Sequence, residues 1–414
     1  MIKRILYTLL IMFPVLASAQ INTDRVMAIG RNALYFEDYV LSIQYFNQVI
    51  NAKPYLSDPY FYRGLAKINL DDFQGAESDC SEAIERNPFV VSAYQVRGLA
   101  RIQQNNFAGA IEDYTKALEF DPENIGVWHN MALCRIRQED YKGAKNDLDK
   151  LIAISPRYTK AYLMRGEVDL KQKDTLAAEK DFGKAIEIDR YDADTWASRA
   201  ILRLQQQRYK DAEADFDHAI RLSTRNSGVY INRALARYHQ NNLRGAMSDY
   251  DIALDIDPNN FIGHYNRGLL RAQVGDDNRA IQDFNFVIEM EPDNMMAIFN
   301  RGLLLDQTGD YKGAIKDYST VINEYPNFLL GYQYRAQARR KIGDVKGADA
   351  DEFKVLKAQL DKQNGVDPNK QTADNTENNK TRKKSDKNMN NYRKIVVADN
   401  EEGEEKYKSD YRGR

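Results

Sequence analysis

The stretch FNRGLLLDQTGDYKGAIKDYSTVINEYP, from Phe299 to Pro326, decides the fold. Its first half is rich in leucine but carries an arginine, Arg301, and its second half holds an acid, Asp317, directly before a tyrosine. Gly309 and Asp310 lie between the halves, and this pair of residue types is typical of a turn. The stretch therefore predicts two helices joined by a tight turn. Arg301 lies within the first helix and Asp317 within the second.

The same stretch recurs with a fixed period, because Pro326 lies 34 residues after Pro292. Counting positions from 1 within each repeat puts these prolines at position 32. The series is broken only at Arg190, Thr224 and Leu360, and its register never slips, so ten repeats are expected over residues 23–360. The other members of the proline series are Pro54, Pro88, Pro122, Pro156 and Pro258.

Three further positions repeat with the same period. Position 8 is always glycine or alanine, position 20 is alanine in nine repeats, and position 24 is aromatic in seven. Small residues at positions 8 and 20 let the two helices of one repeat pack closely. The pattern resembles the tetratricopeptide repeat family over about four fifths of the chain. This resemblance implies an all-α fold, a right-handed α-solenoid of about ten helix-turn-helix repeats whose first helices line a concave groove.

The arginine at position 7 and the aspartate at position 23 recur together, which indicates a structural role. In an antiparallel hairpin these two positions lie opposite each other, so the guanidinium can fork onto the carboxylate. We expect the contact within each repeat rather than between repeats. The pairs are Arg301/Asp317, Arg267/Asp283, Arg63/Asp79, Arg97/Asp113, Arg165/Asp181, Arg199/Asp215, Arg233/Asp249 and Arg335/Asp351.

The opposite side of each first helix carries the candidate binding residues. Position 6 is asparagine in repeats 4, 7, 8 and 9, namely Asn130, Asn232, Asn266 and Asn300, and three of these repeats are consecutive. Position 9 of the same three repeats is leucine: Leu235, Leu269 and Leu303. An amide side chain both donates and accepts, which suits a peptide backbone. The resemblance implies the same role, since family members that hold extended peptides use asparagine here.

Two alternatives accompany these assignments. Asparagine beside arginine is also a common repeat variant without a ligand. The aromatic residues at position 4 are expected in the core against the second helix rather than at a cofactor. Position 6, by contrast, is expected to be exposed. The position-4 aromatics are Tyr60, Tyr94, Trp128, Tyr162, Trp196, Tyr230 and Tyr332.

Composition argues against several classes of protein. The chain has 59 Lys+Arg against 61 Asp+Glu, so it has no basic field for nucleic acid. Its four histidines are scattered, and Cys80 and Cys134 are expected as buried hydrophobic residues rather than a disulfide or metal site. No sequence motif of a known catalytic site is present. We therefore expect no metal, no cofactor and no enzymatic activity.

The first nineteen residues predict an export signal. Lys3 and Arg4 precede an apolar run, and Ala17-Ser18-Ala19 supplies small residues for cleavage after Ala19. The alternative, a membrane anchor, is disfavoured because about a dozen apolar residues are too few to span a bilayer. The expected location is the periplasm, with secretion, or association with an outer membrane through a partner, as the alternative.

The remaining segment, residues 361–414, is rich in charged and amide side chains and is expected to be disordered. Within it the run YRKIVV, residues 392–397, either docks on a partner as a strand or is a short apolar patch guarded by charges. Repeat 10 is expected to be the C-terminal cap, because Glu352 replaces the aromatic residue of position 24 that would meet an eleventh repeat. The sequence leaves open whether the chain continues beyond Arg414.

These observations predict a protein–protein interaction scaffold that binds a protein or peptide segment in its groove. The alternative is an assembly or regulatory arm of a larger envelope complex, with the tail as a linker. Neither the partner nor the oligomeric state follows from the sequence.

Overall fold

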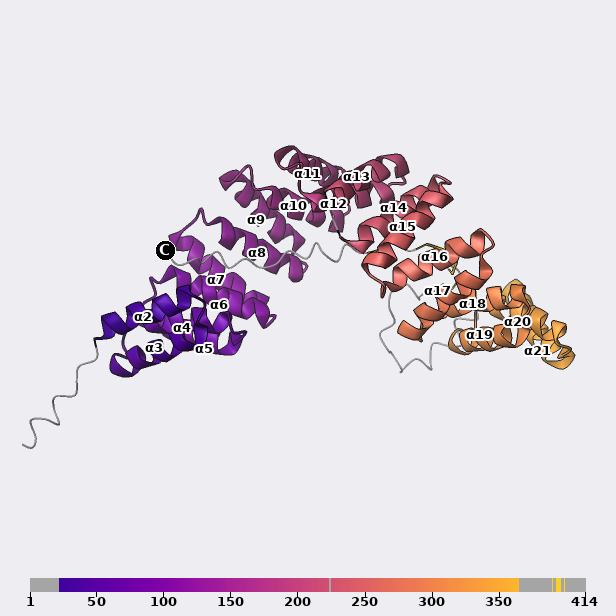
Figure 1. Cartoon of the computed structure of the whole chain (residues 1–414), viewed down its shortest axis with the longest axis horizontal. Coiled ribbons are helices and arrows are strands. Elements are labelled where there is room, and N and C mark those ends of the chain that lie inside the picture. Colours follow the sequence, from indigo (N-terminus) through magenta and orange to yellow (C-terminus); the bar gives the residue numbers. More distant parts are fainter. Residues whose placement is uncertain (1–21, 223–224, 365–388, 390–391, 396–397, 399–414) are drawn as a thin grey trace, which may run out of the picture. The chain divides into compact units, whose positions relative to one another are not determined.

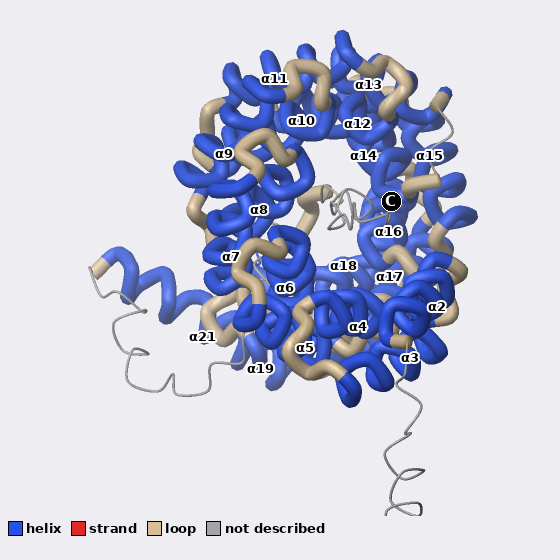
Figure 2. The backbone as a smooth tube through the Cα atoms, turned by 90° about the vertical axis from the view of Figure 1, so that its left-hand side faces the viewer, coloured by secondary structure: helices blue, strands red, loops and turns tan. Residues whose placement is uncertain are grey.

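The computed structural model describes residues 22–222, 225–364, 389, 392–395 and 398. All the elements of these residues are α-helices, and no strand occurs among them (Figures 1 and 2). The helices follow one another in pairs, one pair to each predicted repeat. The expectation of an all-α solenoid of helical hairpins is therefore confirmed, whereas the predicted signal, residues 1–19, lies outside the described residues.

The chain divides into two compact units, the first ending at Arg190 and the second beginning at Tyr191. The first unit contains repeats 1–5, whose helices are α2 (Thr23–Tyr35), α3 (Tyr39–Ala52), α4 (Asp58–Ile68), α5 (Phe73–Arg86), α6 (Val91–Gln103), α7 (Phe107–Phe120), α8 (Ile125–Arg137), α9 (Tyr141–Ile154), α10 (Thr159–Lys171) and α11 (Thr175–Ile188).

The second unit contains repeats 6–10 together with the described residues between Met389 and Ala398. Its helices are α12 (Ala193–Gln205), α13 (Tyr209–Arg221), α14 (Ser227–His239), α15 (Leu243–Ile256), α16 (Phe261–Gln273), α17 (Asp277–Met290), α18 (Met295–Thr308), α19 (Tyr311–Glu324), α20 (Leu329–Lys341) and α21 (Val345–Gln363).

The turn inside each hairpin has one geometry in all ten repeats. Position 15 takes a positive φ, which is 65° at Lys173 and 94° at Gly309. In repeat 5 the next residue, Asp174, donates its N–H to the carbonyl of Asp169 at 2.8 Å and accepts from the N–H of Ala177 at 3.1 Å. This residue ends the first helix and caps the second, so a single turn fixes the hairpin angle.

Small residues at position 8 allow the two helices of a hairpin to touch. A Cβ atom added to Gly302 would lie 2.9 Å from the ring of Tyr318, and one added to Gly166 would lie 2.6 Å from the ring of Phe182. Both rings are completely buried. The glycine and the aromatic residue therefore fill one space between the helices, and this close contact sets the interhelical distance.

The C-terminal repeat extends beyond its predicted bound. Helix α21 continues to Gln363, so the tail begins beyond residue 360. Glu352 is solvated and paired with Arg340 at 2.7 Å, and Phe353, Leu356 and Leu360 next to it are exposed. No further hairpin follows α21 among the described residues, and the capping role of repeat 10 stays a prediction.

Candidate peptide-binding groove

The arginine of position 7 forms an ion pair with the aspartate of position 23 in its own repeat. Arg301 donates from Nε and Nη2 to Asp317 at 2.8 and 2.7 Å, and Arg267 does the same to Asp283 at 3.2 and 2.7 Å. Both carboxylates are almost completely buried. The same pairing occurs in the six other repeats that carry both residues: Arg63/Asp79, Arg97/Asp113, Arg165/Asp181, Arg199/Asp215, Arg233/Asp249 and Arg335/Asp351.

The same guanidinium also reaches the preceding repeat, which the sequence analysis did not anticipate. Nη1 of Arg301 donates to Asn285 at 2.9 Å, and Nη1 of Arg267 donates to Asp251 at 2.8 Å. The predicted pairing of positions 7 and 23 within each repeat is confirmed, and the contact to the preceding repeat is an addition to it. The five N–H donors of an arginine explain the difference, because a forked pair to one carboxylate leaves Nη1 free for a second acceptor.

The aromatic residues of position 4 lie close to these arginines. The guanidinium of Arg199 lies 5.0 Å from the centre of the Trp196 ring, and the Tyr162 hydroxyl donates to the Pro156 carbonyl at 3.1 Å. These residues thus connect the ion pairs to the proline turn of the preceding repeat. The other described pairs are Arg63/Tyr60, Arg97/Tyr94, Arg165/Tyr162, Arg233/Tyr230 and Arg335/Tyr332.

The pKa of the position-23 aspartate depends on the balance between burial and the donors around it. Burial alone would raise the pKa of Asp283, but hydrogen bonds from His264 and Arg267 outweigh burial and hold that pKa below its usual value. Repeat 4 has Met131 in place of the position-7 arginine, and burial raises the pKa of Asp147 to about 6. At Asp113 and Asp249 burial still raises the pKa, although their arginines oppose it.

The asparagines of position 6 are buried, so the expectation that they would be exposed is wrong. Asn232, Asn266 and Asn300 are 1 %, 0 % and 5 % exposed. For Asn232 and Asn300 part of the cover comes from the chain itself, from the segment between residues 389 and 398, of which Met389, residues 392–395 and Ala398 are described. We call this segment the tail segment.

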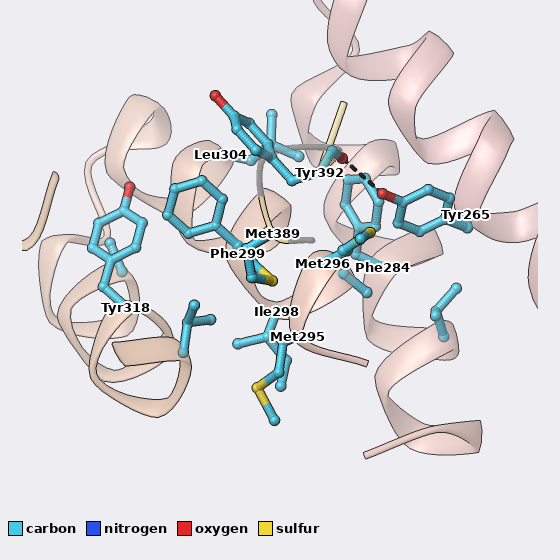
Figure 3. Packing of buried hydrophobic residues seen from close by; sticks show 14 of the residues in the cluster. Tyr265, Phe284, Met295, Met296, Ile298, Phe299, Leu304, Tyr318, Met389 and Tyr392 are labelled. Atoms are coloured by element: carbon cyan, nitrogen blue, oxygen red, sulfur yellow. Dashed lines mark hydrogen bonds between the residues drawn. The ribbon is translucent and has the colours of Figure 1, made fainter. Parts of the chain in front are cut away.

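Asn300 on α18 holds one end of the tail segment by its backbone. Its Nδ2 donates to the carbonyl of Tyr392 at 2.6 Å and to the carbonyl of Met296 at 2.8 Å. The hydroxyl of Tyr265 on α16 donates to the same Tyr392 carbonyl at 2.7 Å (Figure 3). Two side chains from neighbouring repeats thus satisfy one backbone carbonyl in a buried place.

Asn232 on α14 holds the other described end. Its Nδ2 donates to the carbonyl of Ala398 at 3.0 Å, and its Oδ1 accepts from the N–H of Ala398 at 2.9 Å. The amide therefore pairs with both polar groups of one backbone unit, as a neighbouring strand would. Neither asparagine contact requires a particular side chain on the bound segment.

Apolar contacts accompany these hydrogen bonds. The Tyr392 ring meets the Phe299 ring edge-on, with 4.8 Å between their centres, and Met389 is buried in the same cluster (Figure 3). Ile395 packs against the cluster that contains Leu235. A pocket of about 360 Å³ remains beside the tail segment, and its lining includes Leu269 and Leu303 together with Arg393 and Ile395.

The structure thus brings most of the predicted groove residues together. Asn232, Asn300 and Leu235 contact the tail segment or its cluster, and Leu269 and Leu303 line the adjoining pocket. Asn266 is buried at the same position of the intervening repeat, whereas Asn130 is buried on α8 in the first unit. The sequence did not predict that Tyr265 donates to a backbone carbonyl, nor that residues 392–395 pack on the repeats of the same chain.

Other chemistry is sparse in the described part of the chain. Cys80 and Cys134 are free, buried thiols whose pKa values are raised mainly by burial. No group of three or more histidine, cysteine, aspartate or glutamate side chains suited to a metal is found among the described residues. Nor does any described helix combine the length and apolar character needed to cross a membrane.

Comparison with known families agrees with this architecture. Tetratricopeptide repeat models match residues 125–158, 159–192, 198–261 and 265–327, and a related TPR repeat model matches residues 98–134. The chain belongs to the tetratricopeptide repeat family. Domains of this family bind protein or peptide partners, and such proteins are generally non-catalytic scaffolds. No curated protein matches the chain.

Solved structures with the same type of fold cover part of the chain. A tetratricopeptide repeat protein from Parabacteroides merdae is 21 % identical, with a TM-score of 0.48 over 60 % of this chain and 98 % of its own. The C-terminal part of a repeat protein from Cytophaga hutchinsonii is 18 % identical, with a TM-score of 0.48 over 57 % and 97 %. The protein pilF of Pseudomonas aeruginosa is 20 % identical, with a TM-score of 0.43 over 49 % of this chain and 92 % of its own.

Proposed function

We propose that this protein is a non-catalytic adaptor that holds an extended segment of a partner protein in the groove of repeats 7–9. One observation carries the proposal: Asn232 and Asn300 bind the backbone of a segment that lies far from them in sequence. A groove that already holds backbone groups of the chain through side-chain amides has the geometry needed for a partner's segment. Membership of the repeat family supports the same conclusion.

The contacts fit a binder that is selective for shape rather than charge. Each amide hydrogen bond contributes about 0.5–1.5 kcal/mol, so the loss of one asparagine has a small effect. The apolar surface formed by Phe299, Leu269 and Leu303 adds burial for side chains of the bound segment. Neither set of contacts uses the ion pairs that hold the hairpins together, so binding and folding can be separated by substitution.

The test replaces Asn232, Asn266 and Asn300 by alanine together in the full chain. Partners captured from the native cell by this variant are compared with those of the wild type, with Asn130→Ala as the matched control. If the contributions add, we expect about a hundredfold weaker binding for the triple variant and unchanged binding for the control. A triple variant that keeps its helicity and captures the same partners with full affinity would refute the groove.

We propose in addition that the protein is exported and acts in the bacterial envelope. The support is the order of charged, apolar and small residues from Lys3 to Ala19. Fractionation of native cells, with sequencing of the mature N-terminus, tests this. We expect the periplasmic fraction to hold a chain beginning at Gln20; an uncut chain in the cytoplasm would refute export.

A further inference from the structure

The described side chains of the tail segment that contact the repeats lie at intervals of three positions. Met389, Tyr392 and Ala398 are buried and Ile395 is half-buried, whereas Arg393 and Lys394 are exposed. The Tyr392 N–H donates to the Met389 carbonyl at 3.2 Å, so these two residues belong to one turn rather than to an added strand. The contacts beyond this turn fall at Tyr392, Ile395 and Ala398.

The two backbone contacts of the tail segment fall on repeats that are two apart. The Tyr392 carbonyl meets Asn300 in repeat 9, and Ala398 meets Asn232 in repeat 7. Six sequence positions thus separate two contacts that lie two repeats apart, in the direction opposite to the repeat order. Three positions of the bound segment therefore correspond to one repeat on average, and each repeat can offer one amide and one side-chain site per three positions.

The three side-chain sites differ in size. Tyr392 lies among large groups, with the Phe299 ring against it and its carbonyl at the Tyr265 hydroxyl. Ile395 packs on the aliphatic and aromatic cluster that includes Leu235. Ala398 is 4 % exposed, and both of its backbone groups are fixed by Asn232, so a larger side chain there has no room without moving the backbone. The order along the groove is an aromatic, an aliphatic and a small residue.

We propose that the partner's segment carries this pattern, an aromatic residue followed after three positions by an aliphatic one and after three more by a small one. The tail segment is the resident mimic that such a partner must displace. This inference rests on the proposed function, since it names the chemistry of the partner for the same groove. Because a tethered segment acts at an effective concentration of the order of millimolar, a mimic with a dissociation constant of about 0.1 mM weakens partner binding about tenfold.

The experiment uses the full chain and a labelled synthetic peptide with the sequence of residues 387–400, KNMNNYRKIVVADN. Tyr392→Ala combined with Ala398→Glu in the chain removes the ring contact with Phe299 and puts a charged side chain at a buried position, which weakens the resident segment without a substitution in any helix. We expect this variant to bind the peptide about tenfold more tightly than the wild type does. Adding Asn232→Ala and Asn300→Ala to the variant should remove that binding, with unchanged helicity as the check on folding.

Two further peptides test the register. One carries a glycine inserted between the residues equivalent to Arg393 and Lys394, and the matched control carries the same glycine after the last residue. We expect about tenfold weaker binding for the first and no change for the second. Equal binding of both would overturn the three-residue pattern and leave the proposed groove intact.

Two other results bear on the mimic and on the groove separately. Equal peptide affinity of the wild type and the tail variant would overturn the resident mimic. Absence of peptide binding to either chain, while partner capture still depends on the asparagines, would overturn the pattern as the partner's signature. The proposed function itself is refuted by a different result, namely partner capture from the native cell that does not depend on the asparagines.

Discussion

Repeat 4 and repeat 8 carry the same two polar residues but use them differently. Both have asparagine at position 6 and a buried aspartate at position 23. In repeat 8, Asp283 accepts from Arg267, Arg271 and His264, and its pKa is lowered. In repeat 4, Asp147 accepts from Arg135, and its pKa is raised. The residue type alone thus does not determine its state; the balance between burial and the donors around it does.

The asparagines of position 6 also differ in their surroundings. Asn130 is flanked in the neighbouring repeats by Val96 and Met164 at position 6, whereas Asn266 lies between Asn232 and Asn300. An extended segment passes several repeats, so a row of amides binds it better than a single one. Features common to nearly every repeat therefore build the scaffold, and features confined to consecutive repeats form the groove.

The largest expected effect comes from breaking one ion pair. Arg301→Leu should lower the free energy of unfolding by about 3 kcal/mol, because Asp317 is left buried without its guanidinium. Position 11 of repeat 9 is Leu305, and within the described residues Arg301 is the only side chain that donates to Asp317. Chemical denaturation of the single and double variants with Asp317→Leu measures the coupling.

The double variant should regain a large part of that loss, since no orphan charge remains. The same cycle at Arg267 and Asp283 should regain less, because Arg271 and His264 still point at the vacated site. Strict additivity of the two single changes in repeat 9 would contradict the pairing.

The second prediction concerns pH. The folded pKa of Asp147 is about 6 and its ordinary value is 3.8, so the folded protein binds more protons than the unfolded one between these values. The stability from this group is greatest below about pH 4 and is lost as pH rises through 6. Relative to the wild type, Asp147→Asn should therefore gain about 1–2 kcal/mol between pH 4 and 7, with solvent screening allowed for.

Asp283→Asn is the matched control for that measurement. The lowered pKa of Asp283 places its titration below the ordinary value, so its contribution is present above that value and is lost only as pH falls further. Its stability difference from the wild type should stay flat from pH 4 to 7. Parallel slopes for the two variants would contradict the assignment of opposite pKa shifts.

The smallest effect is expected at the turn of each hairpin. Repeats 1–7 place a non-glycine residue at positive φ in position 15, and repeats 8–10 place glycine there. Lys173→Gly should stabilise the protein by up to about 1 kcal/mol, and Gly309→Ala should destabilise it by about 1 kcal/mol. Thermal unfolding of both variants measures this; a loss of stability in Lys173→Gly would show that the turn is not strained.

The sequence predicted the features that repeat. The period, the glycine of position 8, and the pairing of Arg301 with Asp317 all follow from local pattern and from the geometry of one hairpin. The contact of Arg301 with Asn285 was missed because it depends on how successive repeats stack. The tail contacts were missed for a related reason: Asn232 and Ala398 are 166 residues apart, and no periodic pattern connects them.

The central claim, that the asparagines of repeats 7–9 hold the backbone of a bound segment, is tested most directly by hydrogen exchange at the amide of Ala398. That amide donates to Asn232 in a buried place, so it should exchange slowly in the wild type. Asn232→Ala should accelerate its exchange by about tenfold or more, whereas Asn130→Ala should leave it unchanged. Exchange at Ala398 that is fast in the wild type, or unaffected by the loss of Asn232, would contradict the account.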